Sequence, residues 1–251
     1  MSGAELRHHL VASRIAGDVD TPRRSNVGNI RRLTRGEPYA WLGIRPERDY
    51  PFEDLLQIMV ERCGINPDPA YADGPDTIDP DLTLATLDAM GDRLAKAARN
   101  REQVFVATGH PSGVMAIHMP VASALAAAGC ELLTPSPGRV LEVPDGRRNI
   151  RYVGCVGVLG SGGDLNHTHS SLPMEALLKD GMQPDLVLAD HGWAGAAGQA
   201  GIDTLGFADC NDPALFVGAA EGKLEVVVPL DDNVQPHLYE PLTLHLLAAI
   251  G

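Results

Sequence analysis

The sequence predicts an α/β protein: a three-layer, Rossmann-like arrangement around a mainly parallel sheet, with a helical N-terminal segment. Two patterns support this prediction. Short, nearly all-apolar runs such as YVGCVGVL and DLVLA fit strands that are buried on both faces. After residue 101 these runs alternate with helix-length segments, which is the order of a parallel sheet with crossover helices. We therefore expect residues 1–100 to pack as the N-terminal segment on an α/β core of residues 101–251, in one compact unit.

The first hundred residues are expected to be helical and irregular. Helices are predicted over residues 4–15, 52–63 and 79–99. The first two carry apolar residues at the spacing of an amphipathic helix, and Gly64 ends the second. The third begins with Asp79 as N-cap and Pro80 at the first helical position. Residues 21–38 hold too few apolar residues to pack alone, so this polar stretch must lie over another surface.

The rest of the chain alternates between strand and helix patterns. Strands are predicted at residues 104–107, 130–133, 152–159, 186–189, 204–207 and 226–230. Helices are predicted at residues 115–129 and at about 172–180, 213–220 and 236–249. A Pro-Asp-Gly turn within residues 139–151 predicts a small hairpin there.

The composition argues against several classes of protein. The 251 residues include 33 Asp and Glu against 20 Lys and Arg, a net charge of −13, whereas nucleic-acid-binding proteins usually present a basic face. No run reaches 18 apolar residues and the N-terminus lacks a signal-peptide pattern, so we expect neither a membrane partner nor secretion. Four cysteines without a C-x-x-C pair are typical of reduced thiols in a cytoplasmic protein. The apolar helix at residues 115–129 fits either the sheet or a second copy of the chain, which leaves a homo-oligomer open.

The charge is divided unevenly along the chain. Residues 1–62 hold ten arginines against nine acidic residues, whereas residues 152–251 hold thirteen acidic residues against two lysines. Carboxylates suit a cation and guanidinium groups suit an anion, so the two parts suggest a site that binds both. The alternative is a solvated acidic surface with a few structural arginines.

Histidine and aspartate side chains gather where the predicted strands end. Because ligands of open parallel sheets bind beyond the carboxyl ends of the strands, these loops are expected to converge on one rim. The candidate metal ligands are His167, His169, Asp190 and Asp209. This mixture of imidazole and carboxylate suits a divalent cation such as Mg, Mn, Co or Zn. Asp190 and the adjacent His191 are also candidate catalytic residues, although Asp190 could instead cap a helix, as Asp212 before Pro213 is expected to do.

The first of these strands ends in GHPSG, a glycine-bounded turn before a helix. The free N–H groups of such a turn can hold phosphate, so Ser112 and Gly113 are expected to bind substrate, although Ser112 could equally cap the helix. His110 in the same turn is a candidate acid or base. An arginine guanidinium can grip a phosphate through two parallel hydrogen bonds. Further substrate contacts are expected from Arg14, Arg23 and Asn211.

Five stretches of the sequence resemble an actinobacterial family labelled "phosphatase", and the similarity spans almost the whole chain. The stretches are RIAGDVDTPRRSN, ATGHPSG, NHTHS, DHGWAGAAGQAGIDTLGFADCNDPALF and VPLDDNVQPHLYEPLT. The resemblance implies a phosphomonoester hydrolase and leaves its substrate and mechanism open. The matching positions are His110, His167, His169, Asp190, His191, Asp209 and Asp212.

Familiar covalent hydrolase motifs are missing from this sequence. It has no G-x-S-x-G elbow, no cysteine beside a histidine, and no R-H-G motif of the histidine phosphatases. Hydrolysis of a phosphoester would therefore need a metal-activated water.

These patterns together predict a metal-assisted phosphatase that acts on a small phosphorylated molecule, with His110 protonating the leaving group. Two alternatives stay open. A lyase, isomerase or hydrolase could use the same metal rim on an unphosphorylated molecule. A non-enzymatic module could use the same loops, without the metal, to bind a nucleotide or sugar phosphate.

Overall fold

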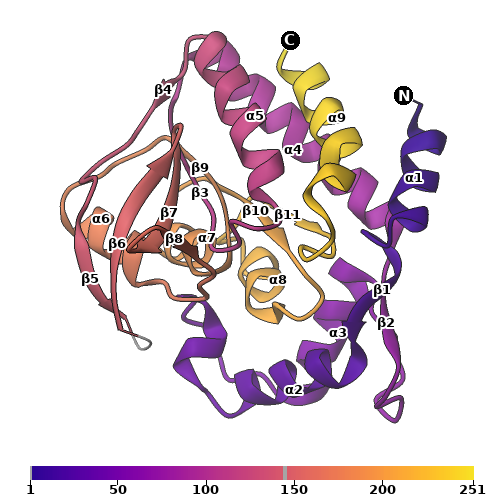
Figure 1. Ribbon diagram of the computed structural model, residues 1–251. Coiled ribbons are helices and arrows are strands. Elements are labelled where there is room, and N and C mark those ends of the chain that lie inside the picture. Colours follow the sequence, from indigo (N-terminus) through magenta and orange to yellow (C-terminus); the bar gives the residue numbers. More distant parts are fainter. Residues whose placement is uncertain (1, 144–145) are drawn as a thin grey trace.

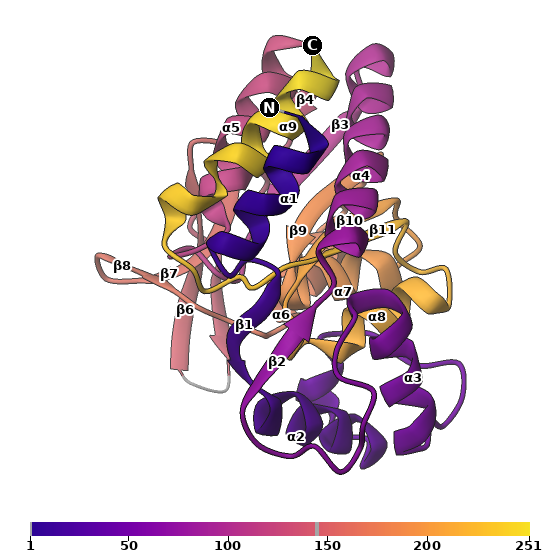
Figure 2. The same cartoon turned by 90° about the vertical axis from the view of Figure 1, so that its right-hand side faces the viewer.

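The N-terminal hundred residues are mostly helical in the computed structural model, which describes residues 2–143 and 146–251 (Figure 1). The elements are α1 (Gly3–Ala12), β1 (Gly17–Pro22), α2 (Arg23–Thr34), α3 (Phe52–Cys63), β2 (Pro75–Ile78) and α4 (Pro80–Asn100). The three predicted helices are confirmed as α1, α3 and α4, and the Asp79 side chain caps α4 by accepting from the N–H of Asp81. Strands β1 and β2 form an antiparallel ribbon that the sequence patterns did not predict. Figure 2 shows this ribbon between α1 and α4 above and α2 below.

The polar stretch at residues 21–38 contains the helix α2, which was not predicted. Its buried apolar residues, Val27, Ile30 and Leu33, are spaced three apart and form a narrow stripe among arginines. Helix α2 contacts α3 and α8 (Pro213–Ala220), which lies far along the chain. The stretch therefore does lie over another surface, as its low apolar content requires.

A mainly parallel sheet forms the centre of the fold. Within the described residues it has nine strands, in the order β11-β10-β9-β3-β7-β6-β5, with β4 beside β3 and β8 beside β7. The parallel strands are β3 (Gln103–Ala107), β4 (Glu131–Leu132), β7 (Val156–Ser161), β9 (Leu186–Asp190), β10 (Thr204–Ala208) and β11 (Val226–Pro229). The antiparallel strands are β5 (Val140–Val143), β6 (Gly146–Val153) and β8 (Asp164–Asn166). The predicted α/β class with a mainly parallel sheet is confirmed, and the Rossmann-like, three-layer description stays a prediction.

One predicted strand, residues 152–159, is wrong as a single element. The structure divides it between β6 and β7, which pair with each other as antiparallel neighbours. The chain reverses at Gly154, whose φ of 58° lies in the left-handed region that favours glycine. Apolar residues on both sides of the turn concealed it from the hydropathy pattern. The hairpin predicted at residues 139–151 is present as the β5–β6 pair, and its Pro144 and Asp145 lie outside the described residues.

The other helices of the fold pack against one another and against strands of the central sheet. The remaining ones are α5 (Met115–Ala127), α6 (Leu172–Lys179), α7 (His191–Gln199) and α9 (Glu240–Ile250). Helices α4, α5 and α9 pack together, and α4 contacts β11 while α5 contacts β3 and β7. Helices α7 and α8 contact each other and β10. One hydrophobic cluster runs from Leu6 in α1 to Leu246 in α9, so residues before and after position 100 share a core.

Helix α7 was not predicted because its sequence, HGWAGAAGQ, is rich in glycine, which disfavours helices. Close packing explains the glycines. A Cβ added at Gly195 would lie 2.0 Å from the carbonyl oxygen of Leu42, and one at Gly192 would lie 2.4 Å from the carbonyl oxygen of Ser170. Tertiary contact therefore overrides local propensity and lets α7 approach these backbones closely.

Substitution of Gly195 by alanine is expected to lower the free energy of unfolding by about 1–3 kcal/mol, because the new methyl group overlaps a backbone oxygen that cannot move freely. The matched control is Gly28→Ala in α2, where an added Cβ meets nothing within 4 Å and should stabilise the helix by about 0.5–1 kcal/mol. Urea unfolding followed by circular dichroism measures both changes. Equal stability of the two variants would contradict the packing that we describe for α7.

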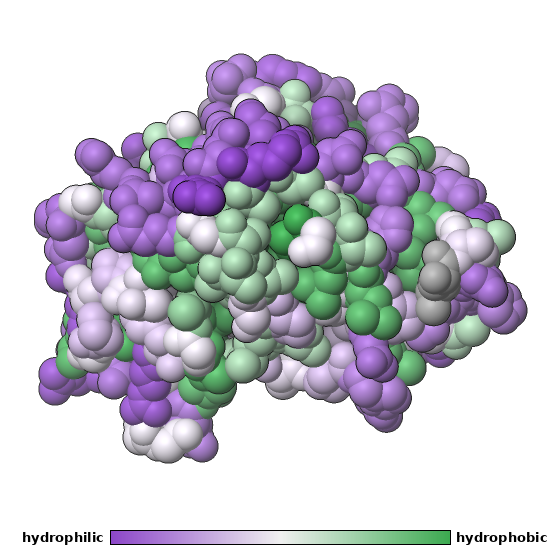
Figure 3. Space-filling model, turned by 90° about the horizontal axis from the view of Figure 1, so that it is seen from above, coloured by the Kyte–Doolittle hydropathy of each residue, from purple (hydrophilic) through white to green (hydrophobic). Residues whose placement is uncertain are grey.

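The face seen from above in Figure 3 mixes apolar and polar residues, with apolar residues gathered near its middle. Helices α5 and α9 expose Met119 and Leu244. Nothing in the structure tests the expected homo-oligomer, which stays a prediction. In the part of the chain that the structure describes, no helix has both the length and the apolar composition that a membrane span needs.

Candidate active site

The carboxyl ends of four neighbouring parallel strands, β3, β9, β10 and β11, meet around one cavity of about 510 Å³. Strand β1 and helix α2 of the N-terminal segment close its other side, since Thr21 and Asn29 also line it. The lining residues are Asp20, Thr21, Pro22, Ser25, Asn29, His110, His167, His169, His191, Asp209, Asn211, Asp231, Asp232 and Asn233. Polar residues that are far apart in the sequence thus share one hollow at the edge of the sheet.

Four histidines stand together in this cavity. The ring of His110 stacks on that of His167 with their centroids 4.5 Å apart, and the ring of His169 lies 4.4 Å from that of His191. The rings of His167 and His169 are 5.0 Å apart. One nitrogen atom from each of His167, His169 and His191 lies within 4.8 Å of the others, a separation that one metal ion could bridge. The 167–169 loop and the end of β9 therefore converge, as the strand-end argument requires.

Two of these imidazoles favour their neutral form. Burial, reinforced by the charge of the neighbouring His191, lowers the pKa of His167 to about 4 and that of His169 to about 3. A neutral imidazole has an unshared electron pair on one nitrogen, which is the form that binds metal ions.

Asp190 faces away from the cavity and holds His191. Its Oδ1 lies 2.8 Å from Nδ1 of His191 and accepts a 2.6 Å hydrogen bond from the N–H of Gly109, while its Oδ2 accepts a 2.5 Å hydrogen bond from Thr108 Oγ1. Burial raises the pKa of Asp190, but the hydrogen bond and charge of His191 outweigh it and lower that pKa to about 2. Asp190 stands at the N-cap position of α7, yet its side chain makes no capping hydrogen bond. Its role in this geometry is to orient His191.

His191 occupies a sharp turn between β9 and α7. Its φ of 47° is unusual for a residue with a side chain, and such backbone strain is common at functional sites. With Nδ1 held by Asp190, its Nε2 lies 3.4 Å from Asp212 Oδ2 and 3.5 Å from Asp232 Oδ2. Burial lowers the pKa of His191, but the carboxylates of Asp212 and Asp190 raise it more strongly, to about 10.

Further carboxylates follow β10 and β11: Asp209, Asp231 and Asp232 line the cavity, and Asp212 contacts His191. Asp212 does stand at the N-cap position of α8, but its side chain makes no capping hydrogen bond, and its buried Oδ2 makes no hydrogen bond at all. Burial raises the pKa of Asp212 to about 6 against the lowering charge of His191. Asp209 accepts a 2.7 Å hydrogen bond from Thr21 Oγ1, which ties the N-terminal segment to the cavity.

The expected substrate-binding residues are only partly brought together. Asn211 lines the cavity, and Gly113 packs beneath Asp232, since a Cβ on Gly113 would lie 2.2 Å from the Asp232 carbonyl oxygen. Ser112 is exposed and does not line the cavity. Arg14 pairs with Asp20 at an exposed position, and Arg23 is buried against Asp76. Among the described residues that line the cavity, none is an arginine or a lysine.

Sequence reasoning did not single out several residues of this site. Asp232, which belongs to two of the three groups that could hold a metal ion, is not among the predicted metal ligands. Thr21 was not considered, because it lies in the polar stretch before α2. The pair Asp231-Asp232 directly after the apolar run VVVPL was the available signal.

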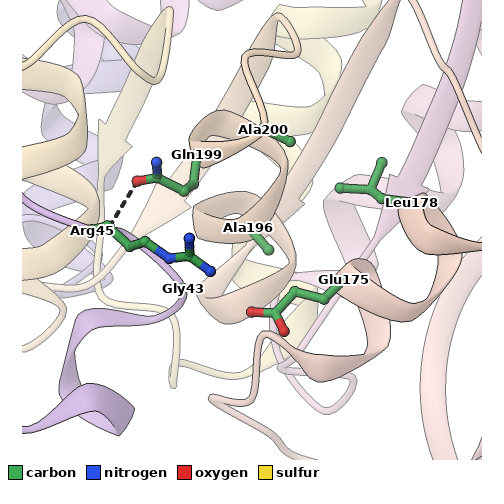
Figure 4. Close-up of a pocket in the computed structure, with 7 residues that line it drawn as sticks. All are labelled: Gly43, Arg45, Glu175, Leu178, Ala196, Gln199 and Ala200. Atoms are coloured by element: carbon green, nitrogen blue, oxygen red, sulfur yellow. Dashed lines mark hydrogen bonds between the residues drawn. The ribbon is translucent and has the colours of Figure 1, made fainter.

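A second hollow, shown in Figure 4, lies between the loop at Gly43 and helices α6 and α7. The N–H of Arg45 donates to Gln199 Oε1 there, over 2.7 Å. Its lining includes one carboxylate, that of Glu175, and no imidazole. The histidine and aspartate chemistry is concentrated in the first cavity.

Comparison with known proteins agrees with the motifs in the sequence. A family model described as Phosphatase matches residues 1–251. The protein named Phosphatase SCO2771 of Streptomyces coelicolor is 47% identical over 257 residues, covering 100% of this chain and 97% of that protein. The resemblance indicated by the sequence motifs is thereby confirmed. The chain belongs to the Phosphatase family.

Proposed function

We propose that this chain hydrolyses a small phosphomonoester with the help of a divalent cation bound at the carboxyl ends of the parallel strands. The observation that carries the proposal is the group of His167, His169 and His191, whose nitrogen atoms lie within 4.8 Å of one another. Imidazoles with neighbouring carboxylates are the donor set of Zn, Co and Mn sites.

Two properties of the donor set fit a cation. The imidazoles of His167 and His169 are neutral and can donate electron pairs. The buried Oδ2 of Asp212 has no hydrogen bond, and an unpaired carboxylate oxygen inside a protein is costly unless a cation or a donor meets it. Asp212 and Asp232 would complete the set around His191.

The bound cation would polarise the phosphoryl group and lower the pKa of an attacking water. Asp190 would keep one hydrogen of His191 on Nδ1 and direct Nε2 toward the cavity, as carboxylates commonly do behind metal-binding histidines. Because the pKa of His191 is raised to about 10, the cation would displace the proton from Nε2 when it binds. His110 lines the same cavity beside His167, and it would protonate the leaving oxygen.

The shape and lining of the cavity support a small substrate. A volume of about 510 Å³ is within the usual range for small-molecule sites. No described residue that lines the cavity is an arginine or a lysine. The negative charge of the phosphate would therefore be balanced by the metal ion and by imidazole groups. Hydroxyl and amide side chains would contact the alcohol part of the substrate. They belong to Ser25, Asn29, Asn211 and Asn233.

Removal of the metal should abolish turnover of p-nitrophenyl phosphate, and adding the metal back should restore the turnover. The protein is stripped with a chelator, dialysed, and assayed with Mg, Mn, Co or Zn added singly, with bound metal measured by elemental analysis. Full activity of the stripped protein would contradict the proposal. Tightly bound metal without phosphate release from any of a panel of phosphomonoesters would instead favour a lyase, isomerase or hydrolase of an unphosphorylated molecule.

The Asp190→Asn variant should lower the affinity of the histidine group for Zn²⁺ by about 10–100-fold, because it removes the charge that holds the His191 tautomer. Isothermal titration of the stripped protein measures this change. The matched control is Asp88→Asn, which alters an exposed aspartate that contacts His245 at 2.7 Å outside the cavity. Equal affinities in the two variants would refute the orienting role of Asp190.

A further inference from the structure

Three further carboxylates stand beside the histidine group. One oxygen from each of Asp209, Asp231 and Asp232 lies within 4.8 Å of the others. Asp209 and Asp231 are each 1% exposed and Asp232 is 7% exposed, so this is a buried cluster and not an acidic surface.

Few positive groups face these carboxylates. His110 Nδ1 lies 3.3 Å from Asp232 Oδ1, and His191 Nε2 lies 3.5 Å from Asp232 Oδ2. Asp209 accepts from Thr21 Oγ1 at 2.7 Å and from the N–H of Cys210 at 2.6 Å. Asp231 accepts from the N–H of Asp20 at 3.3 Å and from that of Asn233 at 2.9 Å, so all four donors are neutral. Each bonded oxygen keeps a free electron pair that can point at a ligand.

A separate observation points to a ligand site between the two clusters. Two polar atoms near Asp232 are buried and make no hydrogen bond: Nδ1 of His110, whose side chain is 5% exposed, and Oδ2 of Asp212, whose side chain is 3% exposed. The Asp212 oxygen lies within 4.8 Å of the Asp232 carboxylate as well as of His191. Their only charged neighbours are Asp232 Oδ1, 3.3 Å from His110 Nδ1, and His191 Nε2, 3.4 Å from Asp212 Oδ2. Buried polar atoms are nearly always hydrogen-bonded in folded proteins, so two that are not, at one place, call for a bound partner.

We propose that Asp209, Asp231 and Asp232 bind a second divalent cation and that Asp232 is shared between this cation and the one at the histidine group. The inference rests on the proposed function for the first cation. Oxygen ligands alone favour Mg²⁺ or Mn²⁺, whereas the histidine group favours a softer ion. The two positions therefore prefer different metal ions. A pair of cations joined by a carboxylate would also supply the positive charge that the arginine-free and lysine-free lining does not offer to a phosphate.

The test counts Mn²⁺ ions on the stripped, full-length protein. Bound Mn²⁺ is followed by the loss of the free-ion signal in electron paramagnetic resonance, and circular dichroism checks that each variant is folded. We expect two ions per wild-type chain and one per chain in Asp231→Asn, with affinity for the lost ion reduced at least about 100-fold. His169→Ala should also bind one ion, and the exposed-residue control Asp164→Asn should keep two.

One ion per wild-type chain would overturn the second site, and this result needs no variant to be folded. Two ions retained in both Asp231→Asn and Asp209→Asn would overturn it as well. Either outcome leaves the proposed function intact if metal-dependent phosphate release persists. Two ions without phosphate release would support the second site while removing the proposed function, so the two failures are distinguishable.

Discussion

The His169→Ala variant is expected to lose about a thousandfold or more in kcat/KM for p-nitrophenyl phosphate. Metal assistance contributes several kcal/mol to the stability of the transition state, and each 1.36 kcal/mol corresponds to a factor of ten in rate. His169 is half-buried at the cavity mouth, where its ring stacks on Tyr39, so its removal changes the ligand set without opening the core. Steady-state kinetics, with metal content measured on the same sample, checks this.

His237→Ala is the matched control for that variant, because His237 is exposed and outside the cavity. It should keep both the activity and the metal content of the wild type. A His169→Ala enzyme with full metal content and full activity would show that the histidine group does not hold the catalytic cation.

The Arg23→Met variant is expected to lose about 3–5 kcal/mol of unfolding free energy, because it leaves a buried carboxylate unpaired. The Arg23 side chain is 0% exposed, and its Nη1 donates to Asp76 Oδ2 at 2.8 Å. Its other nitrogens donate to the carbonyl oxygens of Tyr71 and Asp68. Arg23 therefore joins α2 to the chain around β2, and the sequence-based expectation that it binds phosphate has no support in this position. Urea unfolding measures the loss.

Arg14→Met is the control for the stability loss expected of Arg23→Met. Arg14 pairs with Asp20 at 2.6 Å, but both side chains are exposed, and exposed ion pairs contribute about 0–1 kcal/mol. The two variants could instead lose equal, small amounts of stability while KM rises for Arg23→Met alone. That result would show that Arg23 binds substrate.

The convergence of the site could be predicted from the sequence because it depends on a general property of parallel sheets. His110, Asp190 and Asp209 each follow an apolar run, and the carboxyl ends of neighbouring parallel strands meet at one edge. The apolar runs locate the strands that carry these residues. Which of the loops become neighbours depends on the strand order, which the sequence patterns leave open.

The individual role of each aspartate could not be predicted from the strand positions. An aspartate after a strand can cap a helix, orient a histidine or bind a cation, and its neighbours on other strands decide which. Thr108 and Gly109 occupy the oxygens of Asp190, whereas Asp212 Oδ2 is left without a hydrogen bond. Thr108 and Gly109 are 82 and 81 residues from Asp190 in the sequence, so no local pattern contains them.

Local patterns also failed where tertiary packing decides the conformation. Helix α7 forms in spite of its glycines because Gly195 lets it approach the backbone of Leu42. Helix α2 forms in a polar stretch because α3 and α8 cover its narrow apolar stripe. In both cases the stabilising surface belongs to a distant part of the chain.

The position of a metal ion relative to the 167–169 loop is the most direct test of the central claim. Crystals of the stripped protein are soaked in Zn²⁺ or Mn²⁺, and anomalous difference maps locate the ion. The account predicts a peak at the strand ends, about 2.0–2.2 Å from imidazole nitrogens of His167 and His169. A map with no peak in that cavity, from crystals of active and correctly folded protein, would contradict it.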